Sequence, residues 1–321
     1  MEKKRIAVLT SGGDAPGMNA CIRSIVRNGI YNGFEMVGVI KGYNGLITIE
    51  MIPMDNRSVG KIINRGGTIL RTARCLEFKT EDGQKAALEN IKINNICGVV
   101  VIGGDGSFKG CRALTQLGVP AIGIPGTIDN DLAYTDYTLG FDTAVNTVVD
   151  AITKIRDTMA SHDRVSIIEV MGNRCGDIAL YAGICGGAEY IIVPELSWTI
   201  EGLCEKLEQS KEAGKTSSIV VVAEGAAKGA ALAEEIKKRT SMDTRTTVLG
   251  YIQRGGSPSA DDVLMASRFG AYAINLIKQG IGGRCVGVKN NKLFDMDITE
   301  ACAMTKVFDK DLYDIAEILS R

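Results

Sequence analysis

The sequence predicts an α/β fold of two doubly wound, mostly parallel αβα domains that face each other across an active-site cleft. Short continuous apolar runs alternate with amphipathic helical segments, and glycine-rich turns follow several of these runs. Strands that are apolar on both faces are typical of parallel sheets covered by helices on each side. The 321 residues are enough for one large or two medium domains.

In the first half of the chain, strand, turn and helix follow one another repeatedly. We expect strands at 6–10, 36–40, 98–102 and 121–124. We expect helices after the turn at 11–17, over 83–93 and up to residue 117. Each strand is a short apolar run bounded by turn residues, which is the pattern of a buried strand.

The second half begins with the clearest helix, over 142–161. Its apolar residues recur at intervals of three and four and form one stripe: Val145, Val148, Ile152, Ile155 and Met159. The alternation then restarts, with strands at 165–170, 190–193 and 219–223 and with helices up to 185 and over 200–213. We therefore place a domain change near 139 and a return near 251, with the last helices closing the structure.

Composition limits the classes of partner and compartment. The net charge of −1 gives no general affinity for a polyanion, so we expect no nucleic-acid partner. No apolar run approaches 18 residues and no leader pattern is present, so we expect a cytoplasmic protein with no membrane partner. The nine cysteines contain no C-x-x-C pair, which fits reduced thiols rather than a disulfide framework or a zinc site.

Two Gly-Gly-Asp turns, at 12–14 and 103–105, directly follow predicted strands. Glycine lets backbone N–H groups approach an anion, and the helix that follows adds partial positive charge, so the pair favours phosphate binding. Neither turn matches G-x-G-x-x-G, and Gly214-Lys215-Thr216 is no P-loop because position 209 is Gln209. An Arg-Gly-Gly echo at 65–67 and 254–256 is too short to establish a repeat.

Three carboxylates accompany these turns. Asp105 would repel a bare phosphate, but it suits a Mg²⁺ that lies between them; the alternative is a cap on the next helix. Asp129 and Asp131 follow the strand at 121–124, where they could hold a metal, take a proton or form an ordinary turn. Beside bound phosphates and Mg²⁺, one of them can accept a hydroxyl proton while the other orients it.

Several arginines could supply positive charge to such a site. They are Arg74, Arg164, Arg245 and Arg254. Each alone also fits a solvated or paired surface side chain, although a glycine-rich loop exposes Arg254. We expect Arg245 to precede a strand. Arg23 and Arg27 lie one helical turn apart, which suits a phosphate or a surface ridge equally.

Five stretches together resemble ATP-dependent bacterial 6-phosphofructokinase, over nearly the whole chain. They are TSGGDAPGMN at 10–19, GGDGS at 103–107, PGTIDND at 125–131, EVMG at 169–172 and QRGGSP at 253–258. The resemblance implies transfer of the γ-phosphoryl group of ATP to the 1-hydroxyl of fructose 6-phosphate in glycolysis. It implies ATP as co-substrate, Mg²⁺ as cofactor and Asp105 as the metal contact.

The resemblance also assigns residues. Asp129 is implied as the general base, and the other catalytic residues are Gly13, Arg74, Thr127 and Asp131. The implied ATP site consists of Gly13, Arg74, Cys75, Gly104, Asp105, Gly106 and Ser107. The implied sugar-phosphate site consists of Thr127, Ile128, Asp129, Arg164, Met171, Gly172, Asn173, Glu224, Arg245, Tyr251 and Arg254. The nucleotide-binding domain would then be 1–138 plus 251–303, and the sugar-phosphate-binding domain 139–250 plus 304–321.

The resemblance implies two further sites that are shared between subunits. Arg164 and Arg245 would reach a neighbouring subunit's sugar 6-phosphate, which implies a homotetramer. An effector site for ADP or phosphoenolpyruvate between subunits is matched by Arg23, Arg27, Arg156, Gly187, Glu189 and Lys215. The positions that depart from this site, replacing two arginines and a histidine, are Asn56, Ala213 and Ser217. We therefore expect weakened or altered effector control.

Other departures concern the substrates. Tyr251 replaces a histidine, so it can donate a hydrogen bond to phosphate but brings no positive charge. Asn173 stands where the family usually has arginine. Pyrophosphate-using relatives carry Asp and Lys where this chain has Gly106 and Gly126, and glycine leaves room for the larger nucleotide.

Three alternatives stay open at this point. The same fold could use pyrophosphate or another small acceptor. A non-catalytic nucleotide sensor is disfavoured by Asp129 and Asp131, because a sensor needs no base. A dinucleotide oxidoreductase fits the sheet but lacks the G-x-G-x-x-G turn.

Overall fold

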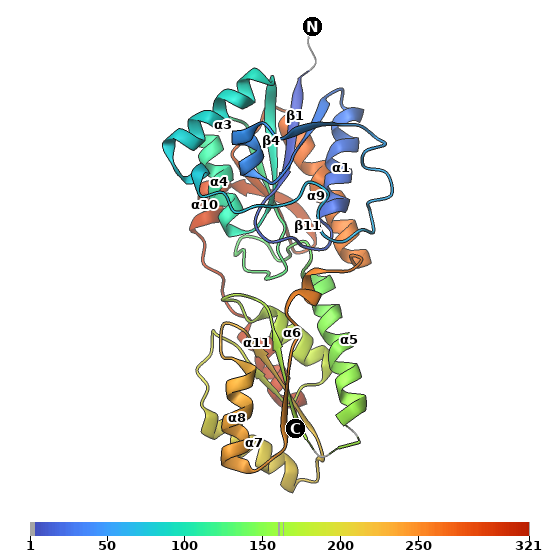
Figure 1. Cartoon of the computed structure of the whole chain (residues 1–321), viewed down its shortest axis with the longest axis vertical. Helices are drawn as coiled ribbons and strands as arrows, with labels where there is room; N and C mark the ends of the chain where they lie inside the picture. The colour runs from blue at the N-terminus through green and yellow to red at the C-terminus, as the bar shows by residue number, and fades with distance from the viewer. Residues whose placement is uncertain (1–3, 160, 163, 321) are drawn as a thin grey trace. The chain divides into compact units, whose positions relative to one another are not determined.

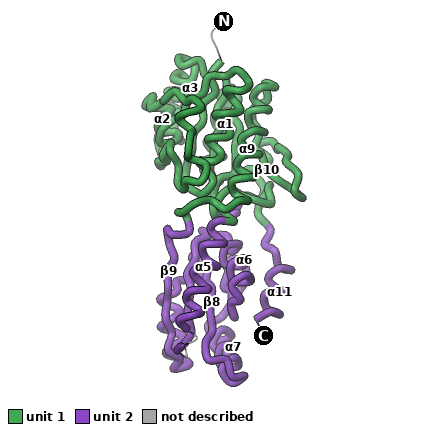
Figure 2. Tube along the Cα trace, turned by 90° about the vertical axis from the view of Figure 1, so that its right-hand side faces the viewer, with its two compact units in different colours: residues 1–128, 132–142, 254–306 green, residues 129–131, 143–253, 307–321 purple. Residues whose placement is uncertain are grey.

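A computed structural model describes residues 4–159, 161–162 and 164–320. The chain forms two compact units, which Figure 2 colours separately. Unit 1 comprises Met1–Ile128, Leu132–Asp142 and Arg254–Lys306, and unit 2 comprises Asp129–Asp131, Thr143–Gln253 and Val307–Arg321. The chain passes between the units at 128/129, 131/132, 142/143, 253/254 and 306/307. We expected domain changes at 138/139, 250/251 and 303/304.

Unit 1 is built on a seven-stranded sheet in the order β11-β10-β5-β4-β1-β2-β3. Its strands are β1 (Arg5–Thr10), β2 (Glu35–Val39), β3 (Met51–Met54), β4 (Ile96–Gly103), β5 (Ala121–Pro125), β10 (Arg284–Lys289) and β11 (Lys292–Asp297). The five central strands are parallel, whereas β3 and β11 pair antiparallel at the two edges. The interior of the sheet is buried on both faces, which explains the continuous apolar runs in β1 and β4.

Helices cover both faces of this sheet. They are α1 (Met18–Tyr31), α2 (Tyr43–Thr48), η1 (Glu77–Lys79), α3 (Glu81–Ile93), α4 (Asp105–Gln116), α9 (Ala260–Lys278) and α10 (Ile298–Ala303). Figure 1 shows α1 beside α9 on one face, with α3 and α4 on the other. On the α4 face, Phe108 and Leu114 pack with Leu9 and Val101 in a fully buried core.

Unit 2 contains a four-stranded, all-parallel sheet in the order β7-β8-β6-β9. Its strands are β6 (Val165–Val170), β7 (Tyr190–Ile192), β8 (Ser218–Ala223) and β9 (Thr244–Val248). The helices are α5 (Phe141–Met159), α6 (Asp177–Gly186), α7 (Ile200–Glu212), α8 (Gly229–Thr240), η2 (Gly250–Arg254) and α11 (Lys310–Leu319). Its core packs Leu203 and Ile236 against Val220 and Val222.

The structure confirms the α/β class with mostly parallel sheets, and it corrects three details. Arg245 lies inside β9, although we expected it to precede a strand. The helix expected to reach 161 ends at Met159, and position 160 lies outside the described residues. We missed β10 and β11, which form a hairpin whose turn residues Asn290 and Asn291 have φ of 48° and 63°. Asparagine tolerates this left-handed conformation, so Asn-Asn was the available signal.

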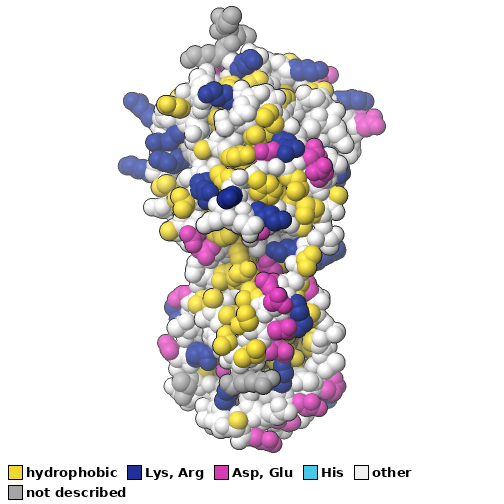
Figure 3. All heavy atoms as spheres, turned by 180° about the vertical axis from the view of Figure 1, so that it is seen from behind, with side chains coloured by type: hydrophobic (Ala, Val, Ile, Leu, Met, Phe, Trp, Pro, Cys, Tyr) yellow, Lys and Arg dark blue, Asp and Glu magenta, His cyan; other side chains and the backbone are white. Residues whose placement is uncertain are grey.

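Surface and thiol properties agree with the composition. On the face that Figure 3 shows, basic side chains are interspersed with acidic and apolar ones. Across the residues that the structure describes, no helix combines the length and apolarity needed to span a membrane. None of the nine cysteines, all of which the structure describes, is in a disulfide. Burial raises the pKa of the Cys21 and Cys111 thiols well above the usual range, which keeps both protonated.

Candidate active site

The predicted nucleotide turns converge at one edge of the unit 1 sheet. Because β1 pairs with β4 and β4 with β5, the turns that follow these strands are neighbours. The backbone N–H of Ser11 donates to the carbonyl of Ile102 at 3.0 Å, and that of Gly126 donates to the carbonyl of Gly103 at 3.0 Å. The strand order changes direction between β1 and β4. Open α/β sheets bind ligands at such a switch point.

The turn after β4 is packed so closely that it depends on glycine. A Cβ at Gly103 would overlap the hydroxyl of Ser107 and the carbonyl of Ser11. A Cβ at Gly104 would lie 3.5 Å from the Cβ of Thr127, so this turn and Thr127 are in close range. A Cβ at Gly106 would meet no atom within 4 Å. The first turn of α4 therefore begins beside open space at Gly106, as a phosphate site requires.

Asp105 is the only predicted metal contact. It is the first residue of α4, its side chain is 50% exposed, and its carboxylate pairs with Lys109 Nζ at 2.6 Å. Within the described ranges, no group of three or more His, Cys, Asp or Glu side chains gathers to hold a metal. This donor set fits a Mg²⁺ that keeps water and takes its other ligands from substrate phosphates. It does not fit an ion held by protein groups alone.

Arg254 lies against the turn after β1. A Cβ at Gly13 would be 2.8 Å from Nη1 of Arg254 and 3.0 Å from its Cζ, so glycine leaves room for the guanidinium group. The structure therefore brings together two residues that the sequence assigned to different ligands. Gly13 was assigned to ATP, and Arg254 to the sugar 6-phosphate.

Arg74 and Cys75 lie in the irregular segment before η1. Arg74 is exposed, whereas Cys75 is partly buried and packs against the unit 1 core. The segment is anchored at the end of β1, where the Thr10 hydroxyl donates to the carbonyl of Arg71 at 3.0 Å. Arg74 is thus a charged side chain on a loop fixed at the same sheet edge.

The turn that carries Asp129 and Asp131 groups with unit 2. Between them, Asn130 is buried with a φ of 51°, and its amide donates to Oδ2 of Asp177 at 2.9 Å. Asp177 opens α6 and is also buried. Asp177 thus holds the middle of the turn. We missed it in the sequence, where it lies 47 residues from Asn130.

In unit 1, Thr127 and Ile128 lead up to this turn. The carbonyl of Thr127 accepts a hydrogen bond from the Thr138 hydroxyl at 2.7 Å. Ile128 is buried. The segment before Asp129 is therefore fixed by packing as well as by the end of β5.

The predicted sugar contacts of unit 2 meet where β6 and β8 end. The backbone N–H of Asn173 donates to Oε1 of Glu224 at 3.1 Å, and that of Met171 donates to Oε1 of Gln253 at 3.1 Å. Gly172 has a φ of 134°, which strongly favours glycine. The structure thus brings together Met171, Gly172, Asn173 and Glu224. Tyr251, in η2, is 80% exposed.

Arg164 and Arg245 lie at the opposite end of the unit 2 sheet. Arg164 precedes β6 and Arg245 is the second residue of β9, whereas Met171 follows the end of β6. Six residues of extended strand cover about 20 Å. One carboxylate, Asp243, pairs with Arg164 Nε at 2.6 Å and with Arg245 Nε at 3.4 Å. One copy of unit 2 therefore does not gather these arginines with Met171.

Four of the predicted effector residues form a cluster in unit 2. Arg156 donates to the carbonyl of Gly187 at 2.6 Å and lies 3.7 Å from the Glu189 carboxylate. Lys215 lies 4.0 Å from the same carboxylate and donates to the carbonyl of Ser320 at 2.8 Å. The other two predicted residues, Arg23 and Arg27, lie on α1 in unit 1.

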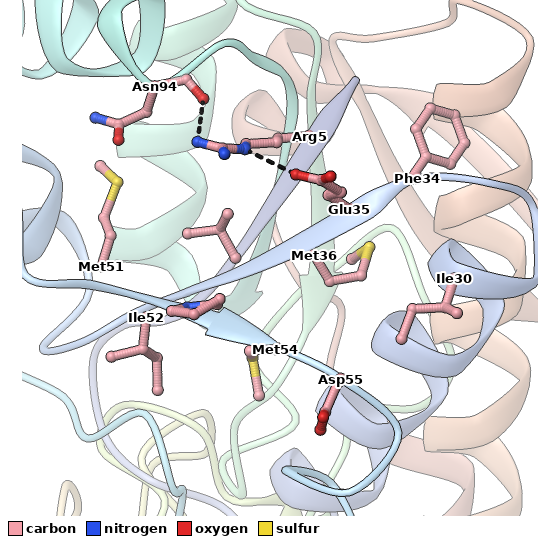
Figure 4. Close-up of a pocket in the computed structure, with 12 residues that line it drawn as sticks. Arg5, Ile30, Phe34, Glu35, Met36, Met51, Ile52, Met54, Asp55 and Asn94 are labelled. Carbon is pink, nitrogen blue, oxygen red and sulfur yellow. Dashed lines mark hydrogen bonds and ion pairs between the residues drawn. The ribbon is translucent and has the colours of Figure 1, made fainter. Parts of the chain in front are cut away.

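A separate cavity of about 470 Å³ lies at the amino ends of β1 and β2 (Figure 4). Met36 and Met54 contribute to its mostly apolar lining. At its edge, Arg5 pairs with Glu35 at 3.1 Å and donates to the carbonyl of Asn94 at 3.3 Å. Among the described lining residues there is no predicted site residue, so the chemistry is expected at the other end of the sheet.

The sequence matches a known family along most of its length. Residues 5–277 match the family model described as Phosphofructokinase. The chain belongs to this family. Among curated phosphofructokinases, the ATP-dependent 6-phosphofructokinase 1 of Clostridium perfringens is 56% identical over 318 residues, covering 99% of this chain and 100% of the relative. The ATP-dependent 6-phosphofructokinase of Clostridium tetani is 57% identical over 317 residues, covering 99% of each chain.

Solved phosphofructokinase structures share the fold. The Saccharomyces cerevisiae phosphofructokinase matches with a TM-score of 0.88 and 31% identity over 99% of this chain. The match covers 47% of the yeast chain, so the present chain spans about half its length. A pyrophosphate-dependent phosphofructokinase from Marinobacter aquaeolei matches with a TM-score of 0.85 over 98% of this chain and 91% of its own. At 22% identity, that likeness concerns the fold alone.

Proposed function

We propose that this phosphofructokinase transfers the γ-phosphoryl group of MgATP to the 1-hydroxyl of D-fructose 6-phosphate, in glycolysis and in the cytoplasm. The products are fructose 1,6-bisphosphate and ADP. The observation that carries the proposal is the convergence of the turns after β1, β4 and β5, the last of which continues directly into Asp129. The relatives named ATP-dependent 6-phosphofructokinase support the choice of donor and acceptor.

The nucleotide would be held mainly by backbone groups of unit 1. The turns at Gly13 and Gly104 and the N-terminus of α4 at Gly106 would offer N–H groups to the phosphates, and Ser107 would line the site. Arg74 would offset charge on the group in transfer, and Cys75 would line the site. Asp105 would hold Mg²⁺, which when bound neutralises phosphate charge.

Asp129 would act as the general base. Its carboxylate accepts the proton of the sugar 1-hydroxyl while the hydroxyl oxygen forms its bond to phosphorus. Thr127 and Asp131 flank the base and keep it oriented. The hydrogen bond from Asn130 to Asp177 holds the turn in its left-handed conformation, so the base is held in place before substrate binds.

The sugar would contact Met171, Gly172, Asn173 and Glu224, with Tyr251 and Arg254 toward its 6-phosphate. Arg164 and Arg245 would serve the sugar phosphate of a neighbouring subunit in a homotetramer. Their separation from Met171 by the length of β6, about 20 Å, supports this assignment, because one copy cannot place both groups on one small sugar.

Two glycines support ATP rather than pyrophosphate as the donor. A side chain at Gly106 would project into open space beside the phosphate turn. A Cβ at Gly126 would lie 2.8 Å from the Cγ2 atom of Ile102. A larger residue at either position would thus occupy space near the nucleotide or strain the end of β5.

ADP or phosphoenolpyruvate would act as effectors with weakened or altered control. Arg156 and Lys215 already contact Glu189, and no arginine or histidine stands at Asn56, Ala213 or Ser217. Each charge-assisted bond that an anion loses is worth about 1.5–3 kcal/mol in favourable cases. Steady-state kinetics with and without each effector test this, and strong inhibition by phosphoenolpyruvate at low micromolar concentration would contradict it.

The function is tested by assaying the purified chain with fructose 6-phosphate and either MgATP or magnesium pyrophosphate. Turnover with MgATP is expected. Asp129→Asn should lower kcat by about 10²–10⁴-fold with little change in fructose 6-phosphate binding. Asp150→Asn, on the exposed face of α5, is the matched control and should leave kcat unchanged.

Three outcomes would contradict the proposal. Turnover with pyrophosphate alone would overturn the choice of donor. Nucleotide binding without turnover of either donor would favour a sensor. A kcat for Asp129→Asn within a few-fold of the wild type would overturn the assignment of the base.

A further inference from the structure

We propose that Asn19 is a positioning residue for the transfer: its side-chain amide fixes segment 65–69 and, through it, the loops that carry Arg74 and Arg254. The inference rests on the proposed function, because it assumes that these two arginines act on the substrates. All of the residues involved lie in unit 1. Asn19 itself is the second residue of α1 and is fully buried.

The amide of Asn19 makes three hydrogen bonds to the backbone of segment 65–69. Its Nδ2 donates to the carbonyls of Arg65 at 2.9 Å and of Gly66 at 3.1 Å. Its Oδ1 accepts from the backbone N–H of Ile69 at 2.8 Å. An amide offers both donors and an acceptor on one planar group, which no other side chain of this size does. The segment is thus held at both of its ends by one side chain.

Gly66 connects this segment to the loop that carries Arg254. A Cβ at Gly66 would overlap the carbonyl oxygen of Gly256, so the two backbones are in direct contact. The two Arg-Gly-Gly stretches at 65–67 and 254–256 therefore pack against each other. The same loop places the guanidinium group of Arg254 over Gly13. A shift of the carbonyls that Asn19 holds would therefore be transmitted to Arg254.

Thr68 connects the segment to the loop that carries Arg74. Its hydroxyl is hydrogen-bonded to the hydroxyl of Thr10 at 2.9 Å. Thr10 also donates to the carbonyl of Arg71, and Lys41 donates its N–H to the carbonyl of Leu70 at 2.8 Å. The chain that leads to Arg74 is thereby attached to the ends of β1 and β2.

The burial of Asn19 supports a role in positioning segment 65–69 rather than in filling space in the core. A buried polar group costs free energy unless its hydrogen bonds are made, and satisfied networks specify one arrangement. An apolar residue would fill the same place on the buried face of α1 and leave the two carbonyls and the Ile69 N–H without this partner. The amide at position 19 thus determines where the loop lies.

The test compares Asn19→Ala with Gly66→Ala, which disturbs the same segment through its contact with Gly256. Asn28→Ala is the matched control, because its amide donates to Ser24 within the same helix. Both test variants are expected to lower kcat/KM for fructose 6-phosphate by about 10–100-fold, as a misplacement of about 1 Å does. Asn28→Ala should stay within a few-fold of the wild type. Thermal unfolding identifies any variant that fails to fold, and the other variant then decides.

A double-mutant cycle separates positioning from general stability. If Asn19 acts through these arginines, Asn19→Ala should have a much smaller effect in the Arg74→Ala background, in the Arg254→Ala background, or in both, than in the wild type. An equal fold-loss in the wild type and in both arginine backgrounds would overturn the inference, as would wild-type kinetics in both test variants. Failure of the wild-type chain to turn over fructose 6-phosphate and ATP would instead overturn the proposed function.

Discussion

The two units fix their predicted site residues by different kinds of contact. In unit 1, the loops that lead to Arg74 and Arg254 are held by neutral groups: the Asn19 amide, the hydroxyl pair of Thr10 and Thr68, and the close backbone contact of Gly66 with Gly256. In unit 2, carboxylates hold backbone N–H groups or arginines at both ends of the sheet: Glu169, Glu189, Glu195, Glu224 and Asp243.

Glu169 illustrates the second kind of contact. Its side chain is 9% exposed, accepts from the N–H of Gly229 at 2.8 Å and pairs with Lys228 at 3.2 Å. Such charge-assisted bonds are strong when buried. In unit 1, a carboxylate in this position would repel the phosphates that the turns are expected to receive. We therefore expect the charge of the ligand to favour neutral groups in the loops that lead to Arg74 and Arg254.

The largest effect is expected in the turn after β4, where Gly103 is closely packed against neutral groups of unit 1. Gly103→Ala would force a Cβ into Ser107 and the Ser11 carbonyl, so it should lower the free energy of unfolding by about 1–3 kcal/mol and abolish ATP binding. Urea unfolding and calorimetric titration with ATP measure both. For comparison, Gly106→Ala meets no atom within 4 Å and should fold normally. Unchanged ATP affinity in Gly103→Ala would show that the turn has freedom to relax.

A smaller effect is expected at the buried carboxylate of unit 2. Asp177→Ala removes the acceptor of the Asn130 amide, which should cost about 1–3 kcal/mol of stability and lower kcat by about tenfold. Asp177→Asn keeps an acceptor and should lose less. Steady-state kinetics beside thermal unfolding distinguish the two roles. Lost stability with an unchanged kcat would mean that Asp177 supports α6 and not the turn.

The smallest effect is expected at the exposed carboxylate. Asp243 is 37% exposed beside Arg164 at 34% and Arg245 at 67%, and such pairs contribute about 0–1 kcal/mol. Asp243→Asn should therefore raise the KM for fructose 6-phosphate by no more than about fivefold, leave kcat unchanged, and lose its effect in high salt. Measurement of KM across a salt series tests this. A large effect that salt does not screen would contradict the contrast between neutral and charged support.

The sequence predicted the turns well because their signal is local. Glycine directly after an apolar run marks a strand that ends in a tight turn, and the converging strand ends at Gly13 and Gly104 follow from the parallel order. The family resemblance supplied the roles of Asp129 and Asp105, which residue types alone left open.

The residues that hold the predicted site residues in place were not predictable in the same way. Asp243 contacts Arg164 across 79 residues, and Asn19 reaches Ile69 across 50. Such pairs depend on which strands are neighbours, and periodicity does not specify strand order. The half-exposed strand β11 was missed for a related reason, since its polar residues weaken the apolar run that marks a strand.

In the proposed homotetramer, each sugar-phosphate site would contain residues of two chains, because Arg164 and Arg245 would come from the neighbouring subunit. They lie at the end of the sheet away from Met171, so a solitary chain would bind its nucleotide yet hold the sugar poorly. At low protein concentration, the total activity would then rise more steeply than in proportion to the protein concentration. Dilution would therefore lower the activity per chain by dissociating the tetramer, even with no effector bound.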